Sequence, residues 1–133
     1  MRTIVCLLSG FFLLLSAVQC TSPEKALNKK LVEMAAGLNE SAPVMLDRYT
    51  RFEGASVTPE NVFRYSYTVV HATNADSLVE KGLEAIKGNI GKEFASNPDL
   101  RVFTENNVHV EYVYNDENGR TIRSLQITPD DYR

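Results

Sequence analysis

Cysteine is almost absent from this chain of 133 residues. The two cysteines are Cys6 and Cys20, both within the first twenty positions. Residues 21–133 therefore cannot form an internal disulfide, and thiol catalysis and a cysteine-based zinc site are excluded there. Tryptophan is missing from the whole chain. A fold built from residues 21–133 has to depend on apolar packing.

An excess of positive charge is also lacking. Arg2 is the only charged residue before position 21, so residues 21–133 carry 13 basic and 17 acidic side chains, a net charge of -4. The two signs are interspersed without a basic run, which argues against nucleic-acid binding. Beyond residue 20 no apolar run reaches the roughly 20 residues that a membrane span needs.

The first twenty residues are typical of a secretory signal peptide. Arg2 precedes an apolar run from Ile4 to Leu15, and small residues follow up to Ser22. This run is too short to span a bilayer, and its charge and small-residue exit fit an export signal. We expect a signal peptide over residues 1–20, a single domain over residues 21–133, and a protein that is periplasmic or secreted.

Cys20 raises a second interpretation of the leader. A cysteine at this place is the lipidated first residue of bacterial lipoproteins, and an acyl anchor would attach the protein to a membrane. Ala17 and Gln19 fit the lipoprotein signal poorly, so ordinary cleavage after Gln19 or Cys20 is the alternative. A membrane is expected as a partner only through this candidate anchor.

The pattern beyond the leader predicts an α+β domain with the order αββαββ. Apolar residues at helical spacing predict an amphipathic helix over 23–39, with Ser22 as its cap, and a second helix that begins after Asn74. Residues 44–71 alternate as two strands, and residues 108–128 as a hairpin that turns at Asn118 and Gly119. We expect two helices packed on one face of a four-stranded antiparallel sheet.

No catalytic motif occurs, and no cofactor or metal is predicted. His71 and His109 could share a metal or a proton if both lie at one end of the sheet, although a surface position is the plainer interpretation. Two carboxylates could hydrolyse a glycoside, but Asp47, Glu53 and Glu111 are equally consistent with surface charge. The turn at 115–119 has a calcium-like composition without the spacing of an EF-hand.

Tyrosine is the remaining clue to function. Four tyrosines lie at alternating positions on two predicted strands, and together with the two histidines they form the candidate binding surface: Tyr65, Tyr67, Tyr112, Tyr114, His71 and His109. Tyrosine offers a large contact area at low entropic cost, which suits recognition. The alternative is that the rings seal the sheet against the helices.

Several short segments resemble a group of small exported bacterial proteins, many without an assigned function. They are residues 97–103 and 108–112, the segment from Ile122 to Asp131, the strand start at residues 50–52 and the run at residues 65–68. The best understood proteins of this layout are pilotins of type II secretion, lipoproteins that bind a secretin segment. The resemblance implies a disulfide from the second helix to the tail, where this chain has Ala95 and Tyr132, and a glycine before the third strand, where it has Asn106 and Asn107.

These observations favour an exported, non-enzymatic module that binds a protein or peptide partner. The binding segment would lie along a sheet edge, or in the groove between the helix at 23–39 and the sheet. The alternative is a periplasmic inhibitor or immunity protein that blocks a secreted hydrolase through a protruding loop, at 58–61 or 115–119. An enzyme would need a concave site that joins a histidine to a carboxylate.

Overall fold

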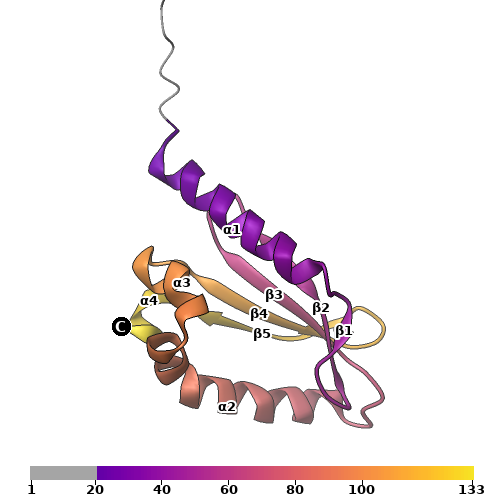
Figure 1. Cartoon of the computed structure of the whole chain (residues 1–133). Helices are drawn as coiled ribbons and strands as arrows, with labels where there is room; N and C mark the ends of the chain where they lie inside the picture. The colour runs from indigo at the N-terminus through magenta and orange to yellow at the C-terminus, as the bar shows by residue number, and fades with distance from the viewer. Residues whose placement is uncertain (1–20) are drawn as a thin grey trace, which may run out of the picture.

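Two long helices lie against a five-stranded sheet in the computed structural model, which describes residues 21–133 (Figure 1). The predicted α+β class and its two helices on one face are confirmed. The elements are α1 (Pro23–Asn39), β1 (Val44–Met45), β2 (Thr50–Val57), β3 (Phe63–Val69), α2 (Ala75–Ser96), a 3-10 turn (Pro98–Leu100), α3 (Arg101–Glu105), β4 (Val110–Asn115), β5 (Thr121–Ile127) and α4 (Pro129–Tyr132).

Helix α1 has the bounds that the sequence predicts. The Ser22 hydroxyl accepts a hydrogen bond from the Lys25 amide at 3.3 Å, and Pro23 occupies a first-turn position where no amide hydrogen is needed. Its buried face, centred on Leu31 and Ala35, packs on β2. Burial of this apolar stripe supplies most of the stability of the helix.

The end of α1 is clamped to β2 through one side chain. The Asn39 amide donates to the Ala55 carbonyl at 2.9 Å, and the Ala55 N–H donates to Asn39 Oδ1 at 2.7 Å. Gly54 sits at a register shift in β2 with φ of 147°, and a Cβ placed there would lie 2.8 Å from Asn39 Oδ1. Only glycine allows both this backbone conformation and so close an approach.

The sheet differs from the predicted one in strand number and in direction. Its order is β1-β2-β3-β4-β5, and the two central strands β3 and β4 pair in parallel while all other neighbours are antiparallel. The four-stranded antiparallel prediction was therefore wrong in both respects. The segment before β2 folds back as the extra strand β1, which alternation over 44–57 did not separate from β2.

The parallel pair follows from the length of the connection between β3 and β4. Helix α2 spans 22 residues, or about 33 Å at 1.5 Å per residue, which returns the chain to the end of the sheet where β3 began. A strand that starts there and pairs with β3 must run in the same direction as β3. Asn74 caps α2 as predicted, since its side chain accepts from the Ser77 amide at 3.0 Å.

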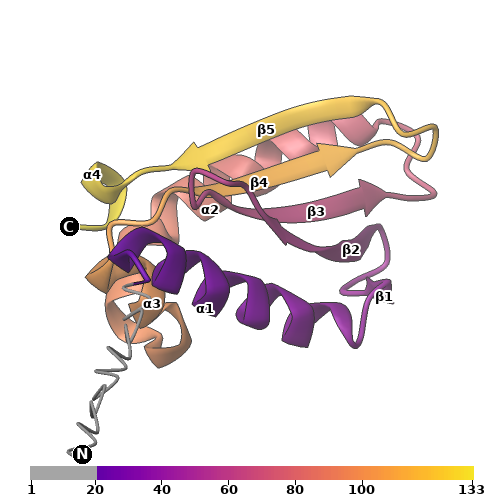
Figure 2. The same cartoon turned by 90° about the horizontal axis from the view of Figure 1, so that it is seen from above.

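The helices pack against one face of the sheet, which we call the inner face. One end of this face is completely covered by packed side chains. Phe63 of β3 and Phe103 of α3 are both 0 % exposed, with ring centroids 5.0 Å apart. The short α3 and α4 are both at this end of the sheet, as the views in Figures 1 and 2 show. We call this packed region the closed end; its aromatic members are Phe63, Phe94, Phe103 and Tyr132.

Tyr132 ties the C-terminal α4 to this closed end. Its ring stacks on Phe94 of α2 with centroids 4.9 Å apart, and its hydroxyl donates to the Val108 carbonyl at 2.9 Å. Burial raises the pKa of this phenol. Where the family resemblance implies a disulfide, the described chain thus has an aromatic contact that joins α2 to the tail.

None of the helices within residues 21–133 is apolar enough over a sufficient length to cross a membrane.

Candidate functional site: an aromatic groove

The four strand tyrosines stand in two matched pairs at the centre of the inner sheet face. The parallel register places Tyr65 opposite Tyr112 and Tyr67 opposite Tyr114. Their rings are nearly parallel, with centroids 5.3 Å apart in the first pair and 4.8 Å in the second. We call these four residues the tyrosine ladder. Because stacked rings brace one another, they present a preformed surface.

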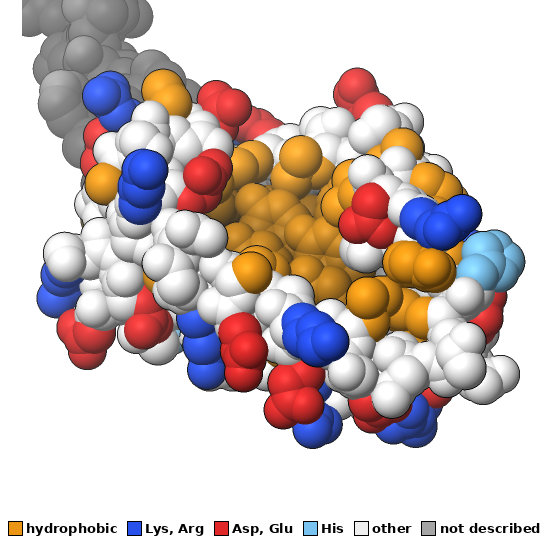
Figure 3. Space-filling model, turned by 90° about the horizontal axis from the view of Figure 1, so that it is seen from below, with side chains coloured by type: hydrophobic (Ala, Val, Ile, Leu, Met, Phe, Trp, Pro, Cys, Tyr) orange, Lys and Arg blue, Asp and Glu red, His pale blue; other side chains and the backbone are white. Residues whose placement is uncertain are grey.

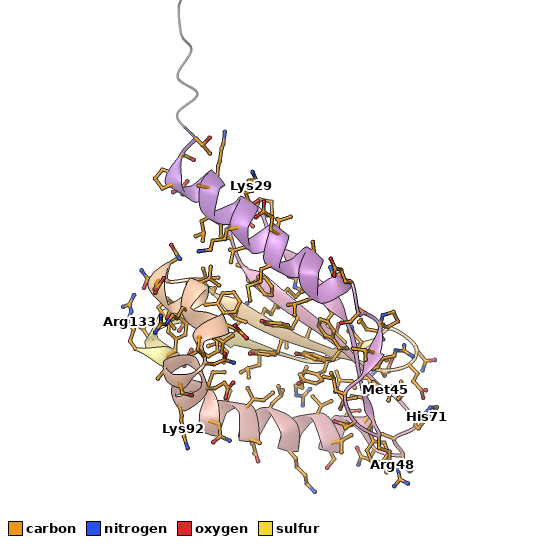
Figure 4. The ribbon with its side chains drawn as sticks, in the orientation of Figure 1. Lys29, Met45, Arg48, His71, Lys92 and Arg133 are labelled. Carbon is orange, nitrogen blue, oxygen red and sulfur yellow. The ribbon has the colours of Figure 1, made fainter. Side chains whose placement is uncertain are left out.

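None of the helices within residues 21–133 covers the ladder. Helix α1 packs on β2 at one side and α2 packs on β5 at the other, so the two central strands lie between them. Figure 3 shows the result as a hollow floored by hydrophobic side chains and walled on both sides. Figure 4 shows side chains of the strands projecting into this space.

The hollow consists of two adjoining cavities that share Ile86 of α2 and Tyr112. The cavity of about 260 Å³ extends to Leu46 and Leu78, and the cavity of about 320 Å³ extends to Ile90 and Glu93. We call the two together the aromatic groove. Its residues beyond the ladder come mainly from α2 and from the loop after β1, and two come from β2 and β3; among them are Leu46, Asp47, Leu78, Gly82, Ile86 and Glu93.

The ladder hydroxyls make no hydrogen bond to any other residue of the described chain, in contrast to Tyr132. Burial raises the pKa of Tyr112 to about 12 and raises those of Tyr65 and Tyr67 further. All of these phenols therefore stay neutral at physiological pH. The groove thus offers an apolar floor with neutral hydroxyl groups, which suits an amphipathic ligand.

Gly82 opens the α2 wall of the groove. A Cβ added at this position would meet no atom within 4 Å, and the same holds at Gly88 outside the groove. The glycines of α2 thus do not serve a close approach to the sheet; among them only Gly91 lies near another element, with its Cβ position 3.6 Å from the Asp131 carbonyl. A bare backbone at Gly82 leaves room for an occupant.

Large apolar side chains remain exposed at one end of the groove. Leu46, in the loop after β1, is 59 % exposed, and Met45, the last residue of β1, is 47 % exposed. Leu78 of α2 is exposed beside them. Such a cluster at the mouth of an apolar hollow is typical of an interaction surface.

The two histidines lie outside this groove and far from each other. His71 follows the end of β3, whereas His109 precedes the start of β4, so parallel pairing separates them by roughly 20 Å along the sheet. His71 points outward in Figure 4, with Nδ1 3.8 Å from Glu117. The condition for a shared histidine site is therefore not met. No cluster of three potential metal ligands occurs among residues 21–133.

Two of the three carboxylates that were candidates for acid catalysis, Glu53 and Glu111, are engaged in ion pairs. Glu53 pairs with Arg51 at 2.7 Å and Glu111 pairs with Arg64 at 2.6 Å, both on the outer face of the sheet. Hydrogen bonds and charge pairing hold the pKa of each below its usual value. A glycosidase acid needs a raised pKa, so this pair does not fit that role.

The two candidate loops are each fixed by side-chain hydrogen bonds. The Asn28 side chain of α1 donates to the Thr58 carbonyl at 3.2 Å and to Asn61 Oδ1 at 2.8 Å. In the turn at residues 115–119, Asp116 is bound by Arg120 at 3.0 Å and by backbone amides. Its carboxylate is therefore already satisfied without a calcium ion.

The four tyrosines of the ladder were named from the sequence, but the residues that line the sides of the groove were not. Nothing in the periodicity of α2 distinguishes Gly82 and Ile86, which face the groove, from residues that face the sheet. Asp47 and Leu46 lie in a loop where no pattern indicates direction. The one available signal was the excess of tyrosine over phenylalanine on strands β3 and β4, because a ring that keeps its hydroxyl is suited to a partly exposed site.

Residues 26–123 match the family described as "Domain of unknown function (DUF8479)", and the chain belongs to that family. No curated protein sequence matches the chain.

Solved structures share the fold. A protein of Pseudomonas aeruginosa (PA3611), described as a "putative secreted protein", is 14 % identical with a TM-score of 0.70, over 85 % of this chain and 99 % of that one. The pilotin EpsS of the Vibrio vulnificus type 2 secretion system is 14 % identical with a TM-score of 0.63, over 83 % and 94 %. The type II secretion system pilotin AspS of Vibrio cholerae is 14 % identical with a TM-score of 0.60, over 81 % and 94 %. The resemblance to pilotins is therefore confirmed in the fold.

Proposed function

We propose that this protein is an exported, non-enzymatic adaptor that holds a helical segment of a protein partner in the aromatic groove, as a pilotin-like protein. The observation that carries this proposal is the uncovered tyrosine ladder between two helical walls. An apolar surface of this kind in a small domain is expected to be covered by a partner. The pilotin fold of the two Vibrio structures supports a protein as that partner.

A helix suits this groove better than an extended strand. Strands β3 and β4 at the floor are each paired on both sides, so the floor has no free edge to which a strand could add. The occupant must therefore bind through side chains on the inner face. A helix with apolar residues at positions i, i+4 and i+7 would lie between α1 and α2 as a third helix of that layer.

The membrane attachment of a pilotin would depend on Cys20, which lies outside the described residues. Cys20 stands three positions before Pro23, the first residue of α1. If Cys20 is acylated, a Cys20→Ser variant should leave the membrane fraction, and the intact mass of the native protein should contain a lipid. If the mature chain instead begins near Thr21 without lipid, the adaptor is soluble and binds its partner in the periplasm or outside the cell.

Site-specific photo-crosslinking in the native host tests the groove directly. A photoreactive residue at Ile86 should capture one partner, whereas the same residue at Ser66, on the outer sheet face, should not. Capture through Asn118 in place of Ile86 would favour the alternative, an inhibitor or immunity protein that acts through its hairpin loop.

A pair of glycine variants then separates binding from folding. Gly82→Leu fills the open space in the groove wall, while Gly88→Leu adds the same side chain to α2 outside the groove. Both should leave the thermal unfolding midpoint unchanged or raised, since leucine favours helix more than glycine does. Only Gly82→Leu should abolish capture at Ile86. Loss of capture in both variants, or in neither, would contradict the proposal.

A further inference from the structure

We infer that the occupant of the aromatic groove is a cationic amphipathic helix, with a basic side chain at each end of its apolar stripe. This inference rests on the proposed function and specifies the chemistry of the partner. The charged side chains that line the two cavities of the groove are Asp47 and Glu93, both acidic, and they stand at its opposite ends. The floor between them is formed by Tyr67, Tyr112 and Tyr114 of the tyrosine ladder.

Both carboxylates are free to receive a cation. Neither Asp47 nor Glu93 forms an ion pair within residues 21–133, whereas Glu53, Glu111 and Asp116 each bind an arginine. Asp47 accepts hydrogen bonds at 2.8 Å from the amides of Tyr49 and Thr50, which fix its orientation. Glu93 accepts one hydrogen bond, from the Asn97 side chain at 3.1 Å.

The negative field of these groups reaches the floor of the groove. The charge of Asp47 contributes to the raised pKa of Tyr114, and the charge of Glu93 contributes to that of Tyr112. Asp47 itself keeps a lowered pKa, chiefly because the Tyr49 amide bonds to it. Lys81 and Arg48 line an adjoining hollow that shares Asp47 and Gly82 with the groove, although neither lines the two cavities of the groove itself. A basic side chain of the partner would therefore meet, at either end, a carboxylate that forms no ion pair within residues 21–133.

The spacing of the two charges sets the length of the partner. Gly82 lies in the same cavity as Asp47, and Glu93 follows 11 residues later on the same face of α2. At 1.5 Å per residue this is about 17 Å, or about three helical turns. A helix that lies along α2 would meet both carboxylates with basic residues about 11 to 15 positions apart. Because both ends carry the same sign, either direction of the helix satisfies them.

Three model peptides test this inference on the full domain, residues 21–133. Each is a helix of about 18 residues with the same leucine stripe, and the two positions at the ends of the stripe hold Lys, Gln or Glu. We expect the Lys peptide to bind about fivefold more tightly than the Gln peptide, and the Glu peptide to bind more weakly than both. The preference should shrink between 50 and 500 mM salt, which are the conditions of the titration, because exposed charges are screened.

Matched variants assign the preference to the two carboxylates. Asp47→Asn and Glu93→Gln together should remove the discrimination between the peptides, while Glu84→Gln, a charge of α2 outside the groove, should not. An asparagine at position 47 can accept the same backbone hydrogen bonds as Asp47, so the local turn and the fold are retained. Equal binding of the three peptides, with Gly82→Leu still blocking all of them, would overturn the cationic inference and leave the proposed function intact.

Other results would overturn the proposed function as well. If no peptide binds, or if Gly82→Leu leaves binding unchanged, the groove is not a helix-binding site. Self-association in sedimentation velocity that Gly82→Leu abolishes would assign the groove to a second copy of this chain. Partition onto neutral phospholipid vesicles that Gly82→Leu abolishes would assign it to acyl chains.

Discussion

The closed end and the tyrosine ladder occupy the same face of the same two strands, yet only one of them is sealed. Phe63 on β3 is 0 % exposed beneath α3, while Tyr67, four residues later on the same strand, is only partly buried. Alternation along a strand specifies which face a side chain joins. Whether that face is covered depends on where the helices pack, and here they pack along its two sides.

The chemistry of the side chains follows this difference. At the closed end, rings without hydroxyls meet one another, and the one hydroxyl present, on Tyr132, donates to a backbone carbonyl. On the ladder, all four rings carry hydroxyls that bond to no described residue. Identical changes in the two regions should therefore have different consequences, which the following variants measure.

The largest difference is expected for removal of a ring. Phe63→Ala would leave a cavity in the closed end and lower the free energy of unfolding by about 3–5 kcal/mol. Tyr67→Ala should cost about 1–2 kcal/mol, because its ring already borders the open groove. Urea denaturation followed by circular dichroism measures both. Equal losses would mean that the ladder is as well packed as the closed end.

A glycine-to-alanine pair tests the clamp that holds the α1 wall in place. Gly54→Ala would set a Cβ 2.8 Å from Asn39 Oδ1 in a backbone conformation unfavourable for alanine, so we expect a loss of about 2 kcal/mol. Gly37→Ala, within α1 and in open space, should stabilise by about 0.5–1 kcal/mol. Thermal unfolding midpoints that shift in the same direction would contradict this assignment.

Removing a single hydroxyl should also affect the stability of the two regions differently, by a smaller amount. Tyr132→Phe loses the bond to the Val108 carbonyl and should lower the free energy of unfolding by about 1 kcal/mol. Tyr67→Phe loses no hydrogen bond within the described chain and should be neutral or slightly stabilising. Chemical denaturation of the two variants beside the parent chain gives both values, and a destabilised Tyr67→Phe would reveal a partner for that hydroxyl.

The last expected effect is a pH dependence that originates in the ladder. The pKa of Tyr112 is raised from about 10 to about 12 by burial, so the folded state holds this proton more tightly than the unfolded state does. The resulting stabilisation is complete below pH 10 and is lost as the pH rises toward 12. Denaturation at pH 9 and pH 11 should show the decline, and Tyr112→Phe should reduce it.

Much of the fold was predictable because its signals are local. Ser22 and Pro23 begin α1, Asn74 caps α2, and the period-two pattern marks β3 and β4. The parallel pairing of β3 and β4 was missed because strand direction depends on the long return through α2, which no local pattern records. The ladder depends on that pairing, so its residues could be named from the sequence while their stacking could not. The groove walls at Gly82 and Asp47 likewise require the placed helix and loop.

The Asn39 clamp has a consequence for the production of this protein. Asn39, Glu40 and Ser41 form an acceptor sequence for N-linked glycans. A eukaryotic secretory pathway attaches the sugar to the asparagine amide, the group that here bonds to the Ala55 carbonyl beneath the end of α1. Glycan attachment and docking of α1 on β2 would then compete for one nitrogen atom. Asn39 is therefore the position to inspect for added mass whenever the chain is made in yeast or animal cells.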